Sequence, residues 1–222
     1  RFLWALAEQP RVAAYLDSPL VELIVEDGRV TGAVVEADGR RRRITARRGV
    51  VLATGGFEHN AEMRARYGVG GLATDTMGAP ANRGLAHQAA IAIGAATDLM
   101  DQAWWAPGLV HPDGRAAFAL CFTGGIFVDR AGRRFVNESA PYDRLGREIL
   151  RAMRAGSVGP RYWMVYDSSA GEQPPVAATN VSFAPFQAYR AAGVWVQADT
   201  LDELARLIGV PPDALTATVR RF

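Results

Sequence analysis

The run RGVVLATGGFEHNAEMRARY, residues 48–67, constrains the fold of this chain more than any other segment. Val50 to Ala53 are apolar and predict a short buried strand, and Thr54 to Gly56 predict the turn that follows it. Asn60 is a typical helix cap and predicts a helix that ends near Tyr67. Because glycine has no Cβ atom, backbone N–H groups at such a turn can approach a phosphate-bearing ligand. The run therefore predicts either a nucleotide site or an ordinary strand-to-helix turn.

Composition excludes several classes of protein. The chain has 222 residues, 49% of them hydrophobic, so it can bury one large core or two modest ones. No apolar stretch approaches the roughly 20 residues of a membrane-spanning helix, and no signal-peptide pattern opens the sequence, so we expect a cytoplasmic protein. The net charge of +2 does not indicate a nucleic-acid partner, and the Arg40 to Arg43 run favours a solvated hairpin turn over a phosphate-binding patch. The single cysteine, Cys121, predicts no disulfide and no metal site, and we expect it to be buried.

The first predicted domain spans residues 1–100. It begins with the tail of a helix at 1–8 and continues with a β-meander that leads into the strand at 50–53. Asp-Gly pairs at 27–28 and 38–39 are typical hairpin turns. The predicted strands of the meander are 12–16, 21–25, 30–36 and 43–46, and the predicted helices of this region are 60–67 and 85–92.

A second domain is predicted from residue 101 to residue 222. Aromatic and proline residues, Trp104 and Trp105 among them, mark a crossing there, so we place the boundary near Met100. The predicted strands are 126–129, 135–136 and 162–166, and the predicted helices are 143–155, 200–208 and 212 onward. Because a helix is predicted at each end of the chain, we expect the sequence to be an internal fragment of a longer protein.

Four blocks of sequence occur in the order found in one known superfamily. They are GVVLATGGFEHNAEM, NRGLAHQAAIAIGAATDLMDQAWWAP, IFVDRAGRRFVNESAPYD and VWVQADTLDELARLIGVPPDALTATVRRF. Over nearly its whole length the chain resembles the fumarate reductase and 3-ketosteroid dehydrogenase superfamily of FAD flavoproteins. The resemblance implies an α/β fold with mixed α+β character. Residues 1–100 would be the second part of a Rossmann-like FAD-binding domain without its GxGxxG segment. Residues 101–222 would be an α+β substrate, or capping, domain truncated at its C-terminus.

One position separates the two branches of the superfamily. Fumarate reductases resemble NE-x-x-(T)RD where this chain reads NESAPYD, so Tyr142 stands in place of the arginine that donates a proton to the dicarboxylate. The 3-ketosteroid dehydrogenases are similar to this chain in NES-x-PY and in AWW-x-P, and they use a tyrosine of this domain to take a proton from the steroid A ring. The resemblance therefore implies that Tyr142 is catalytic. An ordinary tyrosine, with a pKa of about 10, is a poor base unless neighbouring groups assist it. The resemblance implies that these helper groups come from other parts of the family's chain, among them tyrosines of the FAD domain, so that this sequence would hold only part of the active site.

The resemblance also implies cofactor contacts. Leu20 falls where the family's backbone contacts the adenine, and Ala53, Thr54, Gly55 and Gly56 fall where the strand end touches FAD. One departure is at residues 84–86, which read Gly-Leu-Ala where many members have Gly-Asp-Gly. Another is ALCFTGG at 119–125, where relatives tend to have an arginine-containing segment.

Several residues keep two interpretations. Trp104 and Trp105 either line a sterol-sized pocket or belong to the core, and a tyrosine such as Tyr142 is by itself more typical of a core or interface aromatic. Glu138 either orients nearby backbone or is a buried acid paired with an arginine of the 133–134 pair. The three histidines, His59, His87 and His111, lack motif partners and are expected to make local hydrogen bonds or lie on the surface.

Three functions follow from the sequence. The favoured one is an FAD-dependent oxidoreductase that dehydrogenates a 3-oxosteroid or similar cyclic ketone, passing a hydride to flavin N5 and a proton to a tyrosine. Its partners would be a small apolar substrate and an electron acceptor that the sequence does not identify. The second is a fumarate or enoate reductase of the same architecture, which needs a cationic clamp for its substrate. The third is a non-catalytic fragment that lacks bound FAD.

Overall fold

A computed structural model of the chain describes residues 2–171, 173–179 and 182–222. Arg1, the first residue of the predicted helix at 1–8, lies outside the described residues, as does the side chain of Cys121. The chain divides into two compact units. The first comprises Arg1–Met63 and Gly78–Met100, and the second comprises Arg64–Met77 and Asp101–Phe222. The domain limits 1–100 and 101–222 stay a prediction, because compactness alone does not establish a domain that folds independently.

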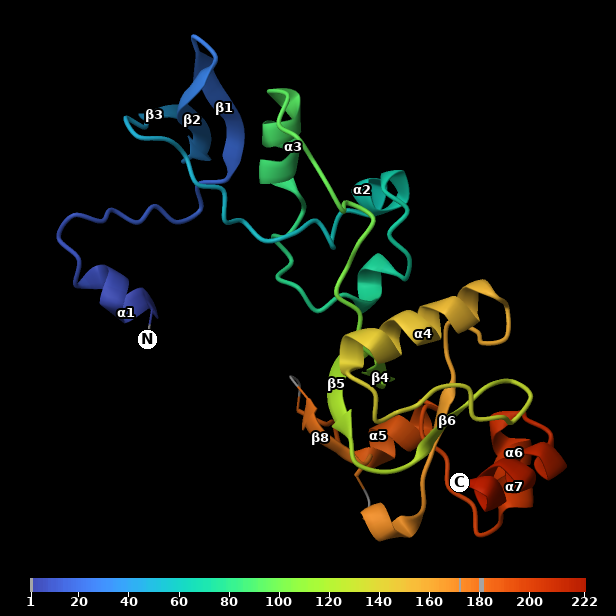
Figure 1. Ribbon diagram of the computed structural model, residues 1–222. Helices are drawn as coiled ribbons and strands as arrows, with labels where there is room; N and C mark the ends of the chain where they lie inside the picture. Colours follow the sequence, from blue (N-terminus) through green and yellow to red (C-terminus); the bar gives the residue numbers. More distant parts are fainter. Residues whose placement is uncertain (1, 172, 180–181) are drawn as a thin grey trace. The chain divides into compact units, whose positions relative to one another are not determined.

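The first unit contains the predicted β-meander (Figure 1). After helix α1 (Phe2–Ala7) come the strands β1 (Leu20–Glu26), β2 (Arg29–Ala37) and β3 (Arg40–Thr45), paired antiparallel in the order β1-β2-β3. Asp27 and Gly28 have φ angles of 49° and 73°, and Asp38 and Gly39 have 54° and 67°. Two successive positive φ values give the turn whose twist matches the flanking strands, which explains why Asp-Gly predicted both hairpins.

The four arginines of β3 lie on an edge strand rather than in a turn. All residues of β3 are exposed. Arg42 forms an ion pair of 2.7 Å with Asp38, and Arg43 lies 3.8 Å from Glu26. Charged side chains on an edge strand discourage a second chain from adding to the sheet, so this run protects the open edge of the meander.

Two predicted strands of this unit are absent from the structure. Residues 12–16 and 50–53 have no regular secondary structure, and Val51 is 90% exposed rather than buried. A strand exists only when its backbone groups pair with a neighbour, and no described strand pairs with either segment. The apolar pattern at 50–53 is therefore not sufficient for a strand within this chain.

The next two helices along the chain, α2 and α3, agree with their predicted positions. Helix α2 (Ala61–Arg66) begins after Asn60, whose Oδ1 accepts a hydrogen bond of 3.0 Å from the Met63 amide. Helix α3 (Leu85–Ala92) lies against β1 and is followed by Gly94, with φ of 83°. The cap and the terminal glycine explain why both helices were readable from sequence.

The second unit is a mixture of short antiparallel strands and helices, which confirms the mixed α/β class. Its strands are β4 (Gly108–Val110), β5 (Ala116–Phe122), β6 (Ile126–Val128), β7 (Trp163–Val165) and β8 (Val176–Thr179). Its helices are α4 (Tyr142–Arg154), α5 (Phe186–Ala191), α6 (Leu201–Ile208) and α7 (Pro212–Arg221), with 3₁₀ turns η1 (Ala73–Asp75) and η2 (Ser168–Ala170). The described sheets have the orders β4-β5-β8 and β6-β7.

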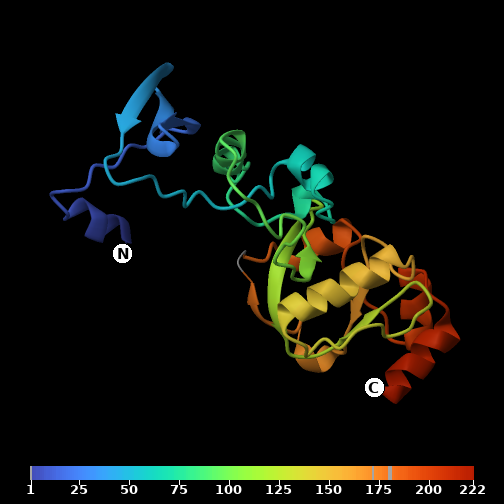
Figure 2. The ribbon, with the colours of Figure 1, turned by 45° about the horizontal axis from the view of Figure 1, so that its top comes forward.

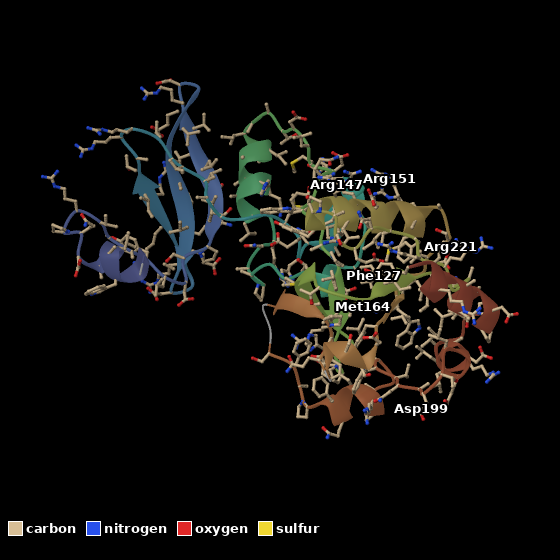
Figure 3. All side chains as sticks on the ribbon, turned by 60° about the horizontal axis from the view of Figure 1, so that its bottom comes forward. Phe127, Arg147, Arg151, Met164, Asp199 and Arg221 are labelled. Atoms are coloured by element: carbon tan, nitrogen blue, oxygen red, sulfur yellow. The ribbon has the colours of Figure 1, made fainter. Side chains whose placement is uncertain are left out.

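Strand β6 is the centre of the core of this unit. Its three residues are all buried, at 3%, 2% and 1% exposure. Because side chains alternate along a strand, Ile126 and Val128 pack against α6 and α7, which lie side by side in Figure 2, while Phe127 packs against α4. Phe127 and its register partner Met164, on β7, are labelled in Figure 3. One short strand therefore holds both groups of helices.

One predicted strand of this unit is wrong. Residues 135–136 do not form a strand; the only pairing of this turn among the described residues is an isolated bridge between Arg134 and Val128. The sequence did not predict β4, β5, β8 or α5. No helix among the described residues is both long and apolar enough to span a bilayer.

We expect Leu215→Ala to lower the free energy of unfolding by about 2–5 kcal/mol, because the lost side chain leaves a cavity in a packed core. Leu215, on α7, is fully buried at 0%, whereas Leu207, on the adjacent α6, is 54% exposed. The matched change Leu207→Ala should stay within about 0.5 kcal/mol. Urea unfolding of both variants measures the difference, and equal losses would contradict this packing of α7.

Candidate functional site

The glycine loop of the first unit presents bare backbone to its surroundings. Ala53, Thr54 and Gly55 are exposed, and Gly55 has a φ of 71°. Within the described part of the chain, the backbone groups of these three residues make no backbone hydrogen bond. Gly56 differs, because its carbonyl accepts a hydrogen bond of 3.2 Å from the Gly84 amide. The loop thus offers polar backbone groups up to residue 55 and is anchored from residue 56.

Residues 78–84 form a second loop that holds the first in place. The His59 amide donates to the Asn82 carbonyl over 3.1 Å, and a ring nitrogen of His59 lies 2.9 Å from the Gly78 carbonyl. The Asn82 amide group donates to the Glu58 carboxylate over 2.6 Å. Asn60 both caps α2 and donates to the Arg83 carbonyl over 3.0 Å. These bonds tie Glu58, His59 and Asn60, which follow the glycine loop, to the loop of residues 78–84.

Gly84 is the point where the two loops approach most closely. It has φ of 76° and precedes α3. A Cβ atom there would lie 2.5 Å from the Met63 sulfur and 2.7 Å from the Phe57 Cβ. Only glycine fits both the backbone angle and the space. The departure from Gly-Asp-Gly at 84–86 therefore leaves the structurally demanding glycine unchanged.

The residues of this unit fit a flavin nucleotide in their chemistry. Exposed backbone groups without backbone partners, at a glycine turn fixed by a second loop, can bind the polar atoms of such a ligand. Leu20 is the first residue of β1 and is paired there with Val35. Its contact with the adenine, and those of Ala53 to Gly56 with FAD, stay predictions.

Tyr142 and Trp104 are brought together in the second unit. Tyr142 is the first residue of α4, directly after Pro141, and is partly buried. Its ring stacks on that of Trp104, with centroids 5.8 Å apart and planes inclined by 30°. Trp104 is 80% exposed, although such large rings are usually buried. The stacked pair therefore forms an accessible aromatic surface next to a phenol.

Trp105 faces a different environment from Trp104. A Cβ atom built on Gly146 of α4 would lie 2.7 Å from the Trp105 Cβ, and one built on Gly71 would lie 3.0 Å from its ring. Trp105 is thus packed between two glycines of the same unit. This packing favours the core interpretation for Trp105 and leaves Trp104 as the candidate for substrate contact.

Glu138 is a buried acid with its oxygens engaged. Its residue exposure is 6%, and Arg134 donates to its Oε2 from Nη2 over 2.6 Å and from Nε over 2.9 Å. Its Oε1 accepts a hydrogen bond of 2.7 Å from the Phe127 amide. Both interpretations of Glu138 are therefore correct, since it pairs with an arginine and orients backbone at once.

His59 and His111 make the local hydrogen bonds that were expected, whereas His87 does not, since its buried Nδ1 has no hydrogen-bond partner among the described residues. Besides His59, His111 makes a hydrogen bond of 2.8 Å between its Nδ1 and the Tyr189 hydroxyl. Burial lowers the pKa of His111, opposed by Asp113, and burial raises the pKa of Tyr189. His87 packs edge-on against Phe57. Residues 111 and 189 are far apart in sequence, so no spacing signal predicts their pairing.

A separate hollow of about 1360 Å³ lies within the second unit. Tyr166, Tyr189 and Trp195 contribute to its lining, but Tyr142 and Trp104 do not. It is therefore not the pocket that the sequence assigned to the tryptophan pair. Among the described residues, no group of three His, Cys, Asp or Glu side chains is placed to hold a metal ion.

Comparisons with known proteins relate this geometry to one family. A family model described as FAD binding domain matches residues 2–222. The chain is 41% identical over 224 residues to the 3-oxosteroid 1-dehydrogenase of Mycobacterium tuberculosis (strain ATCC 25618 / H37Rv), a match that covers 95% of this chain and 40% of the relative. This chain thus spans less than half the length of that relative.

Two solved structures are similar in fold. One is the 3-ketosteroid delta1-dehydrogenase from Sterolibacterium denitrificans in complex with 1,4-androstadiene-3,17-dione, with a TM-score of 0.77 and 34% identity over 93% of this chain and 39% of that one. The other is the open conformation of a flavocytochrome c3 fumarate reductase, with a TM-score of 0.60 and 26% identity over 99% of this chain and 37% of that one. Both branches named by the sequence are therefore represented.

We expect Gly84→Ala to lower the free energy of unfolding by more than Gly94→Ala. Both residues have positive φ, 76° and 83°, so an alanine costs about 1–2 kcal/mol of backbone strain at either. Only at Gly84 does the new Cβ atom meet other atoms, whereas nothing lies within 4 Å at Gly94. Overpacking adds about 1–3 kcal/mol. Equal losses in chemical unfolding would contradict the close approach of the two loops.

Proposed function

We propose that this chain, which belongs to the FAD binding domain family, is part of an FAD-dependent dehydrogenase of 3-oxosteroids or similar cyclic ketones. The observation that carries the proposal is the stacked pair of Tyr142 and Trp104 at the start of α4. A phenol beside an exposed aromatic ring suits an apolar ketone, whereas a dicarboxylate calls for bidentate arginines. The relatives named as steroid dehydrogenases support the same branch.

FAD is the cofactor that the family implies. The backbone of Ala53 to Gly56, with that of Leu20, would hold it, because these residues offer polar groups without an intervening Cβ at the glycines. When bound, FAD supplies the acceptor for a hydride from the substrate carbon next to the α-carbon. The anchoring of this loop by residues 78–84 limits its motion, which suits a site that must hold a large ligand.

Tyr142 has the role of proton acceptor in this proposal. Its phenol oxygen, as the phenolate, takes the proton from the carbon α to the ketone, and the electrons of that C–H bond form the new C=C bond as the hydride departs from the neighbouring carbon. A phenol is a weak base without assistance, so groups beyond the described residues of this unit have to share the task. Trp104 offers its face to the apolar ring system and excludes water from it.

Several parts of the proposal stay predictions. The substrate is taken to be a small apolar ketone, and no electron acceptor is identified. We also infer a cytoplasmic location, which the single cysteine in the sequence supports, since such locations disfavour disulfides.

A reductase of the same architecture is the second candidate. The likeness to the flavocytochrome c3 fumarate reductase favours it. Against it, Tyr142 occupies the position where the resemblance places the proton-donating arginine. A phenol does not supply the charge that orients a dicarboxylate. A third candidate is a chain that folds without flavin, which a colourless purified protein would support.

We expect Tyr142→Phe to lower kcat by about 10²- to 10⁴-fold on a 3-oxosteroid, because the proton acceptor is lost while ring packing is kept. The measurement is anaerobic bleaching of flavin absorbance in the natural full-length protein. Tyr15→Phe is the matched control, since Tyr15 is 69% exposed in the first unit. Unchanged bleaching in Tyr142→Phe would remove the proposed role. Reoxidation of reduced flavin by fumarate, with no response to steroid, would instead establish the reductase.

Trp104→Ala should raise KM for the steroid by up to about tenfold, because an aromatic contact contributes about 0.5–1.5 kcal/mol. Stability should change little, since Trp104 is 80% exposed. Trp4→Ala is the matched control, because Trp4 is 73% exposed and has no proposed contact with substrate. Steady-state kinetics with both variants test this. A KM that is equal in the two variants would contradict a substrate contact at Trp104.

A further inference from the structure

We propose that Glu138 is a positioning residue that sets the place of Tyr142 through the backbone of strand β6. The inference rests on the proposed role of Tyr142 as proton acceptor. Glu138 precedes Tyr142 by four residues, in a segment with no regular secondary structure. Such a segment needs an anchor if the helix that follows is to begin at a fixed point.

The first step of the argument is what Glu138 contacts. Its Oε1 accepts from the Phe127 amide over 2.7 Å, and Phe127 is 2% exposed in the centre of β6. Its Oε2 accepts both donors of Arg134. Arg134 is in turn bridged to Val128, the last residue of β6. Glu138 is therefore linked to β6 directly, through the Phe127 amide, and indirectly, through Arg134.

The second step is how this anchor reaches Tyr142. Between them the chain forms a tight turn, in which the amides of Ser139 and Ala140 bind Asn137 over 3.1 Å and 3.0 Å. Pro141 then fixes the backbone at φ of −50° where α4 begins. With so few free torsions, a displacement of Glu138 is transmitted to the helix start.

The third step is a second contact between α4 and Phe127. Leu145 and Ile149, on the inner face of α4, are 1% and 4% exposed and pack against the side chain of Phe127. The amide of that same Phe127 is the one that Glu138 holds. Phe127 thus positions the start of α4 in two ways. Its side chain packs against the apolar face of the helix, and its amide binds the Glu138 carboxylate.

The fourth step concerns why a charge is present at all. Removing a carboxylate from water is costly, and a buried ion pair contributes little stability compared with apolar residues of the same size. Its hydrogen bonds form in only one geometry, so the ion pair fixes the orientation of the groups that it joins. Both oxygens of Glu138 are engaged, so it is not itself a candidate base.

The test is a kinetic cycle in the natural full-length protein with a 3-oxosteroid. Glu138→Gln keeps the size but offers one acceptor oxygen in place of two, so either the Phe127 amide or Arg134 loses its partner. We expect kcat to fall roughly tenfold to hundredfold, the range for a misplaced catalytic group, with KM within about twofold. Introduced into the Tyr142→Phe background, the same change should lower kcat no further. A purely structural role would lower both backgrounds by the same factor.

Two further variants keep the result interpretable. Arg134→Lys retains the charge with fewer directed bonds, so its kcat should lie between those of the wild type and Glu138→Gln. Asp202→Asn breaks a different carboxylate–arginine pair at i,i+4 spacing, that of Asp202 and Arg206, whose side chains are 58% and 69% exposed, and should leave kcat unchanged. If Glu138→Gln does not fold, Arg134→Lys in both backgrounds gives the same cycle.

The outcomes separate this inference from the proposed function. Full activity in Tyr142→Phe would overturn the role of the tyrosine. A loss of kcat in Tyr142→Phe together with wild-type kcat in Glu138→Gln and in Arg134→Lys would overturn the positioning role alone. A fall in kcat that is the same in both backgrounds would also overturn it.

Discussion

A carboxylate held out of water needs partners on every side, and the second unit is organised around one such group. Glu138 binds the amide of Phe127 and the guanidinium of Arg134. Phe127 is also the residue against which the inner face of α4 packs. Strand β6, only three residues long, therefore receives α4 on one side and α6 and α7 on the other. A change at this strand therefore affects α4, the helix that begins at Tyr142.

The first unit depends on a different constraint, the close approach of two loops. Gly84 has no room for a Cβ atom beside Met63 and Phe57, and Asn60 satisfies a helix amide and a carbonyl of the other loop at once. Residues 53–55, which precede this contact, are exposed. A fixed loop whose residues 53–55 make no backbone hydrogen bond to any described residue is the physical basis for proposing that FAD binds there.

The two units carry complementary parts of the proposed chemistry. The first offers backbone groups for a nucleotide, and the second offers a phenol and an aromatic ring for an apolar substrate. The two neighbouring tryptophans differ in their surroundings. Trp104 is exposed and stacks on Tyr142, whereas Trp105 is enclosed by Gly71 and Gly146 and stabilises the unit instead. Adjacent positions in the sequence therefore have different surroundings.

Local signals predicted the elements that depend on local interactions. The Asp-Gly turns predicted the meander, and Asn60 predicted the start of α2. In the structure the Thr200 side chain caps α6 and Gly94 follows α3, at the limits predicted for those two helices. The same reasoning failed at 50–53 and 135–136, where an apolar pattern was present but no described strand pairs with it. It also missed the local hairpin of β4 and β5, and it missed β8, which exists because residues far apart in the sequence pair with β5.

The sequence by itself determined the fold class of the chain, its resemblance to FAD flavoproteins and the choice of Tyr142 as the candidate proton acceptor. Motifs and caps consist of residues close together in the sequence, so they can be recognised without a structure. Only the tertiary structure decided which tryptophan meets the tyrosine, and that Glu138 holds both Arg134 and the Phe127 amide. Such contacts join residues from separate elements. Their geometry follows from how strands and helices pack, which no spacing along the chain specifies.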